Sequence, residues 1–182
     1  KFKSAEVHQL RLTLEEVSGK DLNWFFNQWY YSPGHPRIQV SYDYNMLENT
    51  VTVNLVQSQA NEFQFPIAID IFENGTKTRT NAFVEGRDAS FKFYFKSKSP
   101  DVIQLNADGV LLADFSENKV LSDYIFQLKN AENYEHKMEA LEEVAKKQDD
   151  KKAFNAVSDA LNDGFYKIRI QALEKIDLIN KW

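Results

Sequence analysis

The sequence contains no cysteine, only three histidines, and few residues that interrupt regular structure: six glycines and four prolines among 182 residues. Without cysteine the chain has no disulfide framework, no thiol nucleophile and no cysteine-based zinc site. No run of about 18 apolar residues occurs, so the sequence predicts no membrane-spanning helix. The net charge of −5 argues against a partner bound through nucleic-acid phosphates.

The remaining composition is that of an ordinary globular protein, with 43% hydrophobic and 27% charged residues. The spacing of the apolar residues changes twice along the chain, from helical to strand-like and back to helical. This pattern predicts an α+β protein in three parts: a helical hairpin in residues 1–35, a β-sandwich in residues 36–117 and helical repeats in residues 118–182. The compartment is left open between cytoplasm and periplasm, because absence of cysteine occurs in both.

The first part predicts two helices in tight succession. Val7, Leu10, Leu14 and Val17 form a stripe at helical spacing in residues 4–17. Ser4 is expected to cap this helix, and Gly19 to end it. Ser18 and Asp21 have the spacing of a capping box, which predicts that the second helix starts near Gly19. Pro33, Gly34 and Pro36 then end the second helix.

The second helix carries an unusually large apolar face. Its five residues at i, i+3, i+4, i+7 and i+8 are Leu22, Phe25, Phe26, Trp29 and Tyr30. A hairpin of about 30 residues cannot close its own core. Both apolar faces therefore need a partner, which is either the sandwich of this chain or a domain outside it.

The middle part alternates apolar and polar residues and predicts an antiparallel, immunoglobulin-like sandwich of seven strands. Asn74-Gly75 is the strongest hairpin signal, and Pro66 indicates an edge position or the start of a strand. Phe91, Phe93 and Phe95 alternate with polar residues, which favours a core face over a sugar- or peptide-binding platform. The predicted strands are 38–44, 51–55, 65–71, 77–84, 91–95, 102–105 and 110–113.

The last part predicts four amphipathic helices and an internal repeat. The helices are indicated by apolar stripes within 121–128, 134–144, 154–161 and 168–179, the last of which ends at Ile179. The segment 133–144 aligns with 165–176, an offset of 32 residues from Ala140 to Ala172. Helix pairs at this period indicate HEAT-like repeats. Such stacks end in polar caps, so we expect the natural polypeptide to continue beyond Trp182.

The sequence predicts no catalytic, cofactor-binding or metal-binding residues. The three histidines, His8, His35 and His136, fall in different predicted elements and none is paired in H-E-x-x-H. The Asn74-Gly75-Thr76 sequence matches a glycosylation sequon, but a hairpin turn explains it. Lys137 and Arg169 occupy matching repeat positions, where we expect hydrogen bonds between helices.

Two stretches carry a family resemblance. The run V-S-G-K-D-L-N-W-F-F-N-Q-W (Val17 to Trp29), followed by P-G-H-P at 33–36 and a strand, resembles the end of the catalytic domain in zinc aminopeptidases of the aminopeptidase N type. The run P-D-V-I-Q-L-N-A-D-G-V-L-L-A-D (Pro100 to Asp114) looks like the last sandwich strands of that family. By contrast, the segment M-L-E-N (Met46 to Asn49) differs from the family's G-x-M-E-N segment, because a leucine separates Met from Glu, and it predicts a polar turn.

The resemblance implies a non-catalytic C-terminal piece of a metallopeptidase that removes N-terminal residues from peptides. It implies zinc in the longer enzyme and no cofactor in this chain, since H-E-x-x-H is absent here. The implied partners are an upstream catalytic domain, further C-terminal helices and, for the longer enzyme, peptide substrates. Two alternatives are a scaffold of the same architecture without peptidase activity and a free-standing sugar-binding sandwich. A start at Lys1 without methionine suits a piece of a longer protein.

Overall fold

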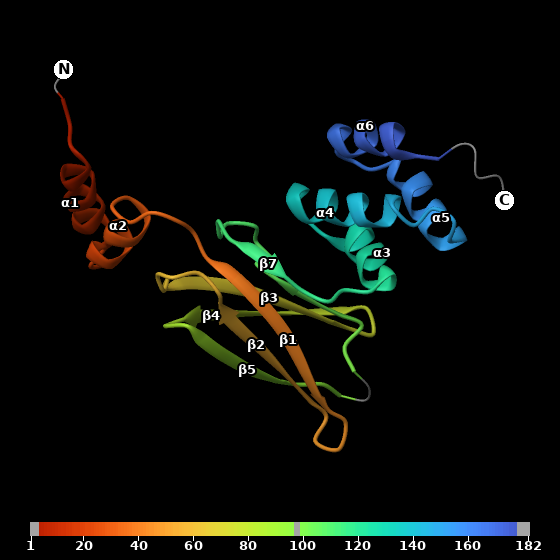
Figure 1. Ribbon diagram of the computed structural model, residues 1–182, viewed down its shortest axis with the longest axis horizontal. Helices are drawn as coiled ribbons and strands as arrows, with labels where there is room; N and C mark the ends of the chain where they lie inside the picture. The colour runs from red at the N-terminus through yellow and green to blue at the C-terminus, as the bar shows by residue number, and fades with distance from the viewer. Residues whose placement is uncertain (1–3, 97–98, 178–182) are drawn as a thin grey trace.

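The computed structural model describes residues 4–96 and 99–177, and its elements form three groups along the longest axis of the molecule (Figure 1). Helices α1 (Val7–Ser18) and α2 (Asn23–Trp29) lie at one end. Two β-sheets occupy the middle, and helices α3 to α6 lie at the other end. The predicted α+β composition and its order along the chain are confirmed.

The N-terminal helices begin at different residues from those predicted. Helix α1 begins at Val7, where the Glu6 N–H donates to the Gln9 side chain, so Ser4 does not cap it. Gly19 ends α1 as expected, in the left-handed conformation (φ 67°) that glycine tolerates. The Ser18 hydroxyl donates to the carbonyl of Leu14 within α1. The predicted capping box is therefore wrong, and α2 starts only at Asn23.

Within residues 4–96 and 99–177, seven strands form two facing sheets, ordered β5-β2-β1-β7 and β4-β3-β6. Their bounds are β1 Arg37–Asn45, β2 Thr50–Gln57, β3 Phe65–Glu73, β4 Thr76–Val84, β5 Asp88–Tyr94, β6 Val102–Leu105 and β7 Asp114–Ser116. Every pairing is antiparallel except that between β1 and β7, which is parallel. The predicted fully antiparallel arrangement is thus corrected at one pair, and an immunoglobulin-like topology stays a prediction.

The last strand lies four residues later than predicted. The Asn106 side chain donates to the carbonyl of Leu111 and accepts from its N–H, both at 3.1 Å. This side chain takes the place of a neighbouring strand, so the predicted strand 110–113 is irregular. Regular pairing starts at Asp114, whose N–H donates to the carbonyl of Pro36 at 3.0 Å.

The core of the sandwich follows the predicted alternation. Phe95 is buried, and Phe91 and Phe93 pack against the same cluster, so the aromatic face serves the core. Asn74 and Gly75 both have positive φ, as a type I′ turn requires. Pro66 is the second residue of β3, the central strand of its sheet, so it marks the beginning of a strand rather than an edge.

The C-terminal helices are α3 (Leu121–Asn130), α4 (Tyr134–Ala145), α5 (Lys151–Ala160) and α6 (Tyr166–Lys175). They share a second core, in which the repeat-related residues Ala140 and Ala172 are both fully buried. Lys137 pairs with Asp163, and Arg169 donates to the carbonyl of Asp163 at 2.8 Å. Both cations therefore bond to the loop before α6, and not directly from helix to helix as the sequence predicted. Ile179 lies outside the described residues, and HEAT-like stacking stays a prediction.

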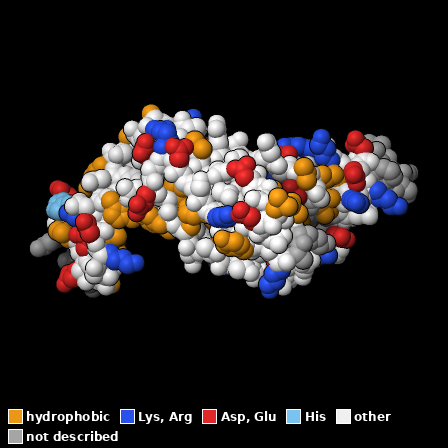
Figure 2. Space-filling view, turned by 90° about the horizontal axis from the view of Figure 1, so that it is seen from below, with side chains coloured by type: hydrophobic (Ala, Val, Ile, Leu, Met, Phe, Trp, Pro, Cys, Tyr) orange, Lys and Arg blue, Asp and Glu red, His pale blue; other side chains and the backbone are white. Residues whose placement is uncertain are grey.

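The two N-terminal helices differ in how they meet the sandwich. The Trp29 ring lies 5.2 Å from that of Phe63, and the Gln28 side chain exchanges two hydrogen bonds with the backbone of Gln64. In contrast, α1 contributes no buried residue. Figure 2 shows hydrophobic side chains on the surface between these helices and the sandwich. Of the two partners considered for the hairpin, the sandwich therefore covers part of α2 and leaves α1 uncovered.

Within the described ranges, no helix has the length and apolar character needed to cross a membrane.

Candidate functional site

The histidines and the M-L-E-N segment do not converge on one site. His8 lies on α1 with its Nδ1 3.3 Å from a Glu6 oxygen, His35 contacts Asp114 at 2.9 Å, and His136 belongs to α4. Residues 4–96 and 99–177 contain no group of three or more histidine or acidic side chains placed to hold a metal ion. The Asn45 side chain accepts the N–H groups of Leu47 and Glu48, as expected for a polar turn.

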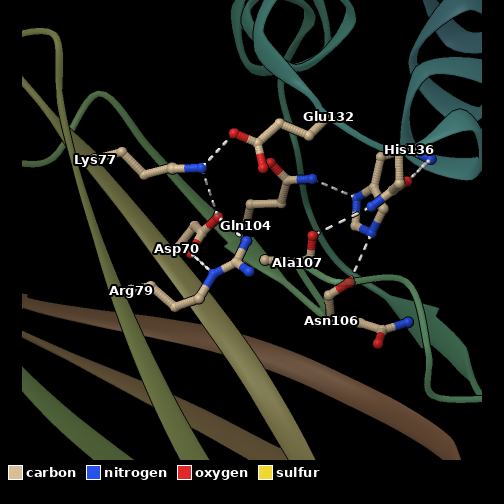
Figure 3. A network of polar contacts seen from close by, with 9 residues as sticks. Asp70, Lys77, Arg79, Gln104, Asn106, Ala107, Glu132 and His136 are labelled. Carbon is tan, nitrogen blue, oxygen red and sulfur yellow. Dashed lines mark hydrogen bonds and ion pairs between the residues drawn. The ribbon is translucent and has the colours of Figure 1, made fainter.

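Polar side chains gather instead where α3 and α4 meet the sandwich. We call this region the junction and define it by Tyr42, Asp70, Lys77, Arg79, Gln104, Asn106, Glu117, Lys119, Gln127, Glu132, Asn133, His136 and Glu139. Part of it is drawn in Figure 3. It contains three connected sets of contacts, each joining strands to the helical bundle.

The first set is centred on Asp70, which lies on β3 and is 3% exposed. Arg79 on the neighbouring strand donates to both carboxylate oxygens at 2.7 Å (Figure 3). This bidentate hydrogen bond raises the pKa of the Arg79 guanidinium, although burial opposes the shift. Lys77 lies between Asp70 and Glu132, a residue just before α4, and so links the sheet to the bundle.

The second set is centred on His136, in the first turn of α4. Its Nε2 lies 3.0 Å from the carbonyl oxygen of Asn106, which can only accept, so Nε2 carries the proton. Its Nδ1 then accepts from the Gln104 amide at 2.7 Å (Figure 3). Burial lowers the pKa of His136, and the Asn106 carbonyl opposes this only in part. The neutral imidazole thus bridges β6, the following loop and α4.

Asn133 fixes the position of this histidine. Its Oδ1 accepts the His136 N–H at 2.8 Å and caps α4, while its Nδ2 donates to the carbonyl of Ala107 at 3.2 Å. Gly109 has φ 68°, and a β-carbon there would lie 3.3 Å from the Asn133 side chain. Glycine is therefore required at this turn for conformation and for space.

The third set is an ion pair between Glu117 and Lys119, 3.1 Å apart, with both side chains only 7% exposed. The Tyr42 hydroxyl donates to Glu117 at 2.6 Å. Burial, followed by the charge of Glu117, strongly raises the pKa of Tyr42. On the other side, Lys119 lies 3.8 Å from Glu139 of α4. The pair therefore connects strand β1 to the helical bundle.

Gln127 on α3 completes the junction. Its amide nitrogen donates to the carbonyl of His136 at 2.9 Å and to Glu139 at 2.7 Å. Its oxygen is a buried side-chain atom without a hydrogen-bond partner within the part of the chain that the structure describes. These contacts join α3 to α4, and the three sets above join both helices and the preceding loops to the sandwich.

The junction was not predicted from the sequence, although the composition of β3 indicates a buried polar contact. The run F-P-I-A-I-D-I-F in β3 is nearly continuous in apolar residues, which is typical of a strand buried on both faces. Ile67 and Ile69 pack in the sandwich core, whereas Phe72 on the opposite face contacts Phe126 of α3. A lone Asp70 in such a run indicates a buried polar contact beneath a covering element.

Comparison with known proteins finds a structural likeness but no match in sequence. No family model and no curated protein matches the chain. Among solved structures, the crystal structure of Legionella pneumophila aminopeptidase A in complex with aspartic acid is similar, with a TM-score of 0.72 and 15% sequence identity. The match covers 87% of this chain but only 20% of that protein. The likeness shows a shared fold with one part of that aminopeptidase.

Proposed function

We propose that this chain is a non-catalytic supporting portion of a zinc metallo-aminopeptidase that removes N-terminal residues from peptides. In this role the sandwich is a spacer between a catalytic domain and a helical domain that helps to enclose the peptide cavity. The observation that carries the proposal is the shared fold over 87% of the chain with a solved aminopeptidase. The junction supports the spacer role, because its buried contacts fix the helices on the sandwich.

The zinc of such an enzyme does not fit the residues described here. H-E-x-x-H is absent from the sequence, and the described histidine and acidic side chains form no group of three that could bind a metal ion. We therefore assign zinc to another part of the longer enzyme and derive no catalytic step from this chain.

The exposed face of α1 supports a covalently linked neighbour. Leu10, Leu14 and Val17 are 46%, 42% and 83% exposed, although their spacing is that of a buried stripe. We propose that the upstream catalytic domain covers this face.

The test compares Leu14→Glu with wild type in two contexts, the 182-residue chain and the full-length polypeptide from its parent gene. In the isolated chain this exposed substitution should change the free energy of unfolding by no more than about 0.5 kcal/mol. In the full-length protein it should lower the Tm by several degrees, because a charge is placed in an apolar interface. An equal Tm for both full-length proteins would contradict the proposed interface.

The control is Glu16→Gln, a substitution at an exposed α1 position that adds no charge. The parent gene must also encode H-E-x-x-H and a third glutamate ligand upstream. If the gene lacks that motif while the interface effect is present, the chain belongs to a scaffold of the same architecture. If both are absent, the proposal is wrong.

A further inference from the structure

A groove of about 520 Å³ runs between the β7 end of one sheet and the first turns of α4. One wall is the continuous segment 109–115 together with Glu117 and Lys119, and the other is formed by Glu135, His136 and Glu139. Its size is within the range of ligand sites in proteins. The groove lies beside the junction, and the supporting role proposed above makes no use of it.

The β7 part of the strand wall is a sheet edge, whereas the backbone of Leu111 just before it is bonded to the Asn106 side chain. Strand β7 is the last strand of its sheet, and among the described strands it pairs with β1 alone. The Asp114 N–H donates to Pro36, so the backbone groups of Asp114 face β1. Because backbone groups alternate in direction along a strand, the N–H and C=O of Phe115 point away from β1. Such an edge is a template for a further strand.

The same wall offers apolar contacts just before the edge. Val110 and Leu112 are 74% and 70% exposed, whereas Leu111 and Ala113 between and after them pack against the sandwich core. Exposed apolar residues at alternate positions match the alternating side chains of an extended ligand. Main-chain hydrogen bonds and pockets for alternate side chains are the two elements of strand-addition binding.

The lining of the groove carries four carboxylates and one ammonium group, that of Lys119. Asp114 contacts His35 and Arg37, and Glu117 pairs with Lys119. The remaining two, Glu135 and Glu139, lie one helical turn apart on α4 and line the groove. Glu139 accepts the Gln127 amide at 2.7 Å and lies 3.8 Å from Lys119, whereas Glu135 has no such partner among the described residues. The negative charge disfavours an acidic ligand and is complementary to lysine or arginine side chains.

We propose that this groove binds an extended peptide segment that carries lysine or arginine at alternate positions. The segment adds as a strand to the edge formed by Ala113, Phe115 and Glu117, with its main chain bonded to Phe115. Its basic side chains meet Glu135 and Glu139, and its apolar side chains contact Val110 and Leu112.

The probe is the synthetic peptide Lys-Val-Lys-Val-Lys-Val-Lys, titrated into the 15N-labelled chain. We expect saturable binding with a dissociation constant below about 1 mM. The amide signals of 110–117 should shift, and the Phe115 amide should exchange more slowly with solvent. The same peptide N-methylated at alternate residues on its bonding edge should lose binding, since it cannot donate to the strand. N-methylation on the opposite edge is the matched control.

The protein variant is Glu135→Lys, chosen because Glu135 is exposed and makes no hydrogen bond or ion pair recorded in the structure. It should weaken probe binding roughly fivefold, within the range measured for exposed charge pairs. Asp149→Lys, the same change in charge beyond the far end of α4, should leave binding unaltered.

Four results would overturn the proposal. The first is the absence of saturable binding, and the second is equal binding of both N-methylated peptides, which would indicate attraction by charge alone. The third is a set of shifted signals that excludes 110–117. Preference for Glu-Val-Glu-Val-Glu-Val-Glu over the lysine peptide would also refute the assigned charge.

Discussion

The buried ion pair at the junction provides a quantitative prediction. In Lys119→Met the side chain keeps a similar length but loses the ammonium group that contacts Glu117 at 3.1 Å. The Glu117 carboxylate then remains buried with the Tyr42 hydroxyl as its close partner, at 2.6 Å. Removing one partner of a buried pair leaves an uncompensated charge and costs about 3–5 kcal/mol. We expect the free energy of unfolding to fall by that amount.

The double variant Glu117→Gln with Lys119→Met separates this cause from a simple loss of packing. The glutamine is neutral and can still accept the Tyr42 hydroxyl, so no charge is left buried. Because neutral replacement of a buried pair is often without net cost, we expect the double variant to lose only about 1 kcal/mol. The double variant should therefore be more stable than the single variant Lys119→Met.

The assay is urea unfolding followed by far-ultraviolet circular dichroism at pH 7, with the slope m compared between variants. Lys146→Met is the control, because Lys146 pairs with Glu143 but is 62% exposed. Its loss should stay below about 1 kcal/mol. A loss below about 1 kcal/mol in Lys119→Met, or a double variant less stable than the single one, would show that no uncompensated charge is left buried at Glu117.

Three further predictions concern other parts of the fold. Trp29→Ala should cost about 2–3 kcal/mol in urea unfolding, because the ring is half-buried and full burial would raise the cost to about 3–5 kcal/mol; a loss below about 1 kcal/mol would mean that it faces a partner outside the chain. Burial lowers the pKa of His136, so as the pH falls the histidine is protonated in the unfolded chain before it is protonated in the folded chain. The free energy of unfolding should therefore decrease as the pH drops below about 6.5; a His136→Gln variant whose unfolding free energy has the same pH dependence would contradict this. Gly109→Ala should cost at least about 1 kcal/mol, whereas Gly164→Ala, with open space and no positive φ, should cost less; equal Tm values would be inconsistent with strain at Gly109.

Local signals in the sequence predicted much of the fold. Gly19 ends α1, Asn74-Gly75 forms its hairpin and the Phe91 to Phe95 face enters the core, because each depends on backbone conformation or on alternation along one segment. The capping box failed because Ser18 has a competing acceptor, the Leu14 carbonyl one turn earlier. The last strand was predicted four residues too early, because the backbone of Leu111 bonds to the Asn106 side chain and not to a neighbouring strand. The spacing of apolar residues cannot reveal such a contact.

The junction could not be predicted because its contacts join residues far apart in the sequence. Tyr42 and Glu117 are separated by 75 positions, and Asn106 and His136 by 30. Each of these residues is unremarkable in its own segment, where a polar side chain is most simply exposed. These residues come together only in the assembled fold, in which the helical bundle lies against the sandwich.

Bound zinc and aminopeptidase activity, measured in parallel on the 182-residue chain and on the full-length polypeptide, test whether this chain is the non-catalytic portion of a zinc aminopeptidase. Atomic emission gives the zinc content, and release of a chromophore from aminoacyl reporter substrates gives the activity. We predict stoichiometric zinc and cleavage in the full-length protein and neither in the 182-residue chain. Stoichiometric zinc with cleavage by the 182-residue chain, or a full-length protein with neither, would contradict the account.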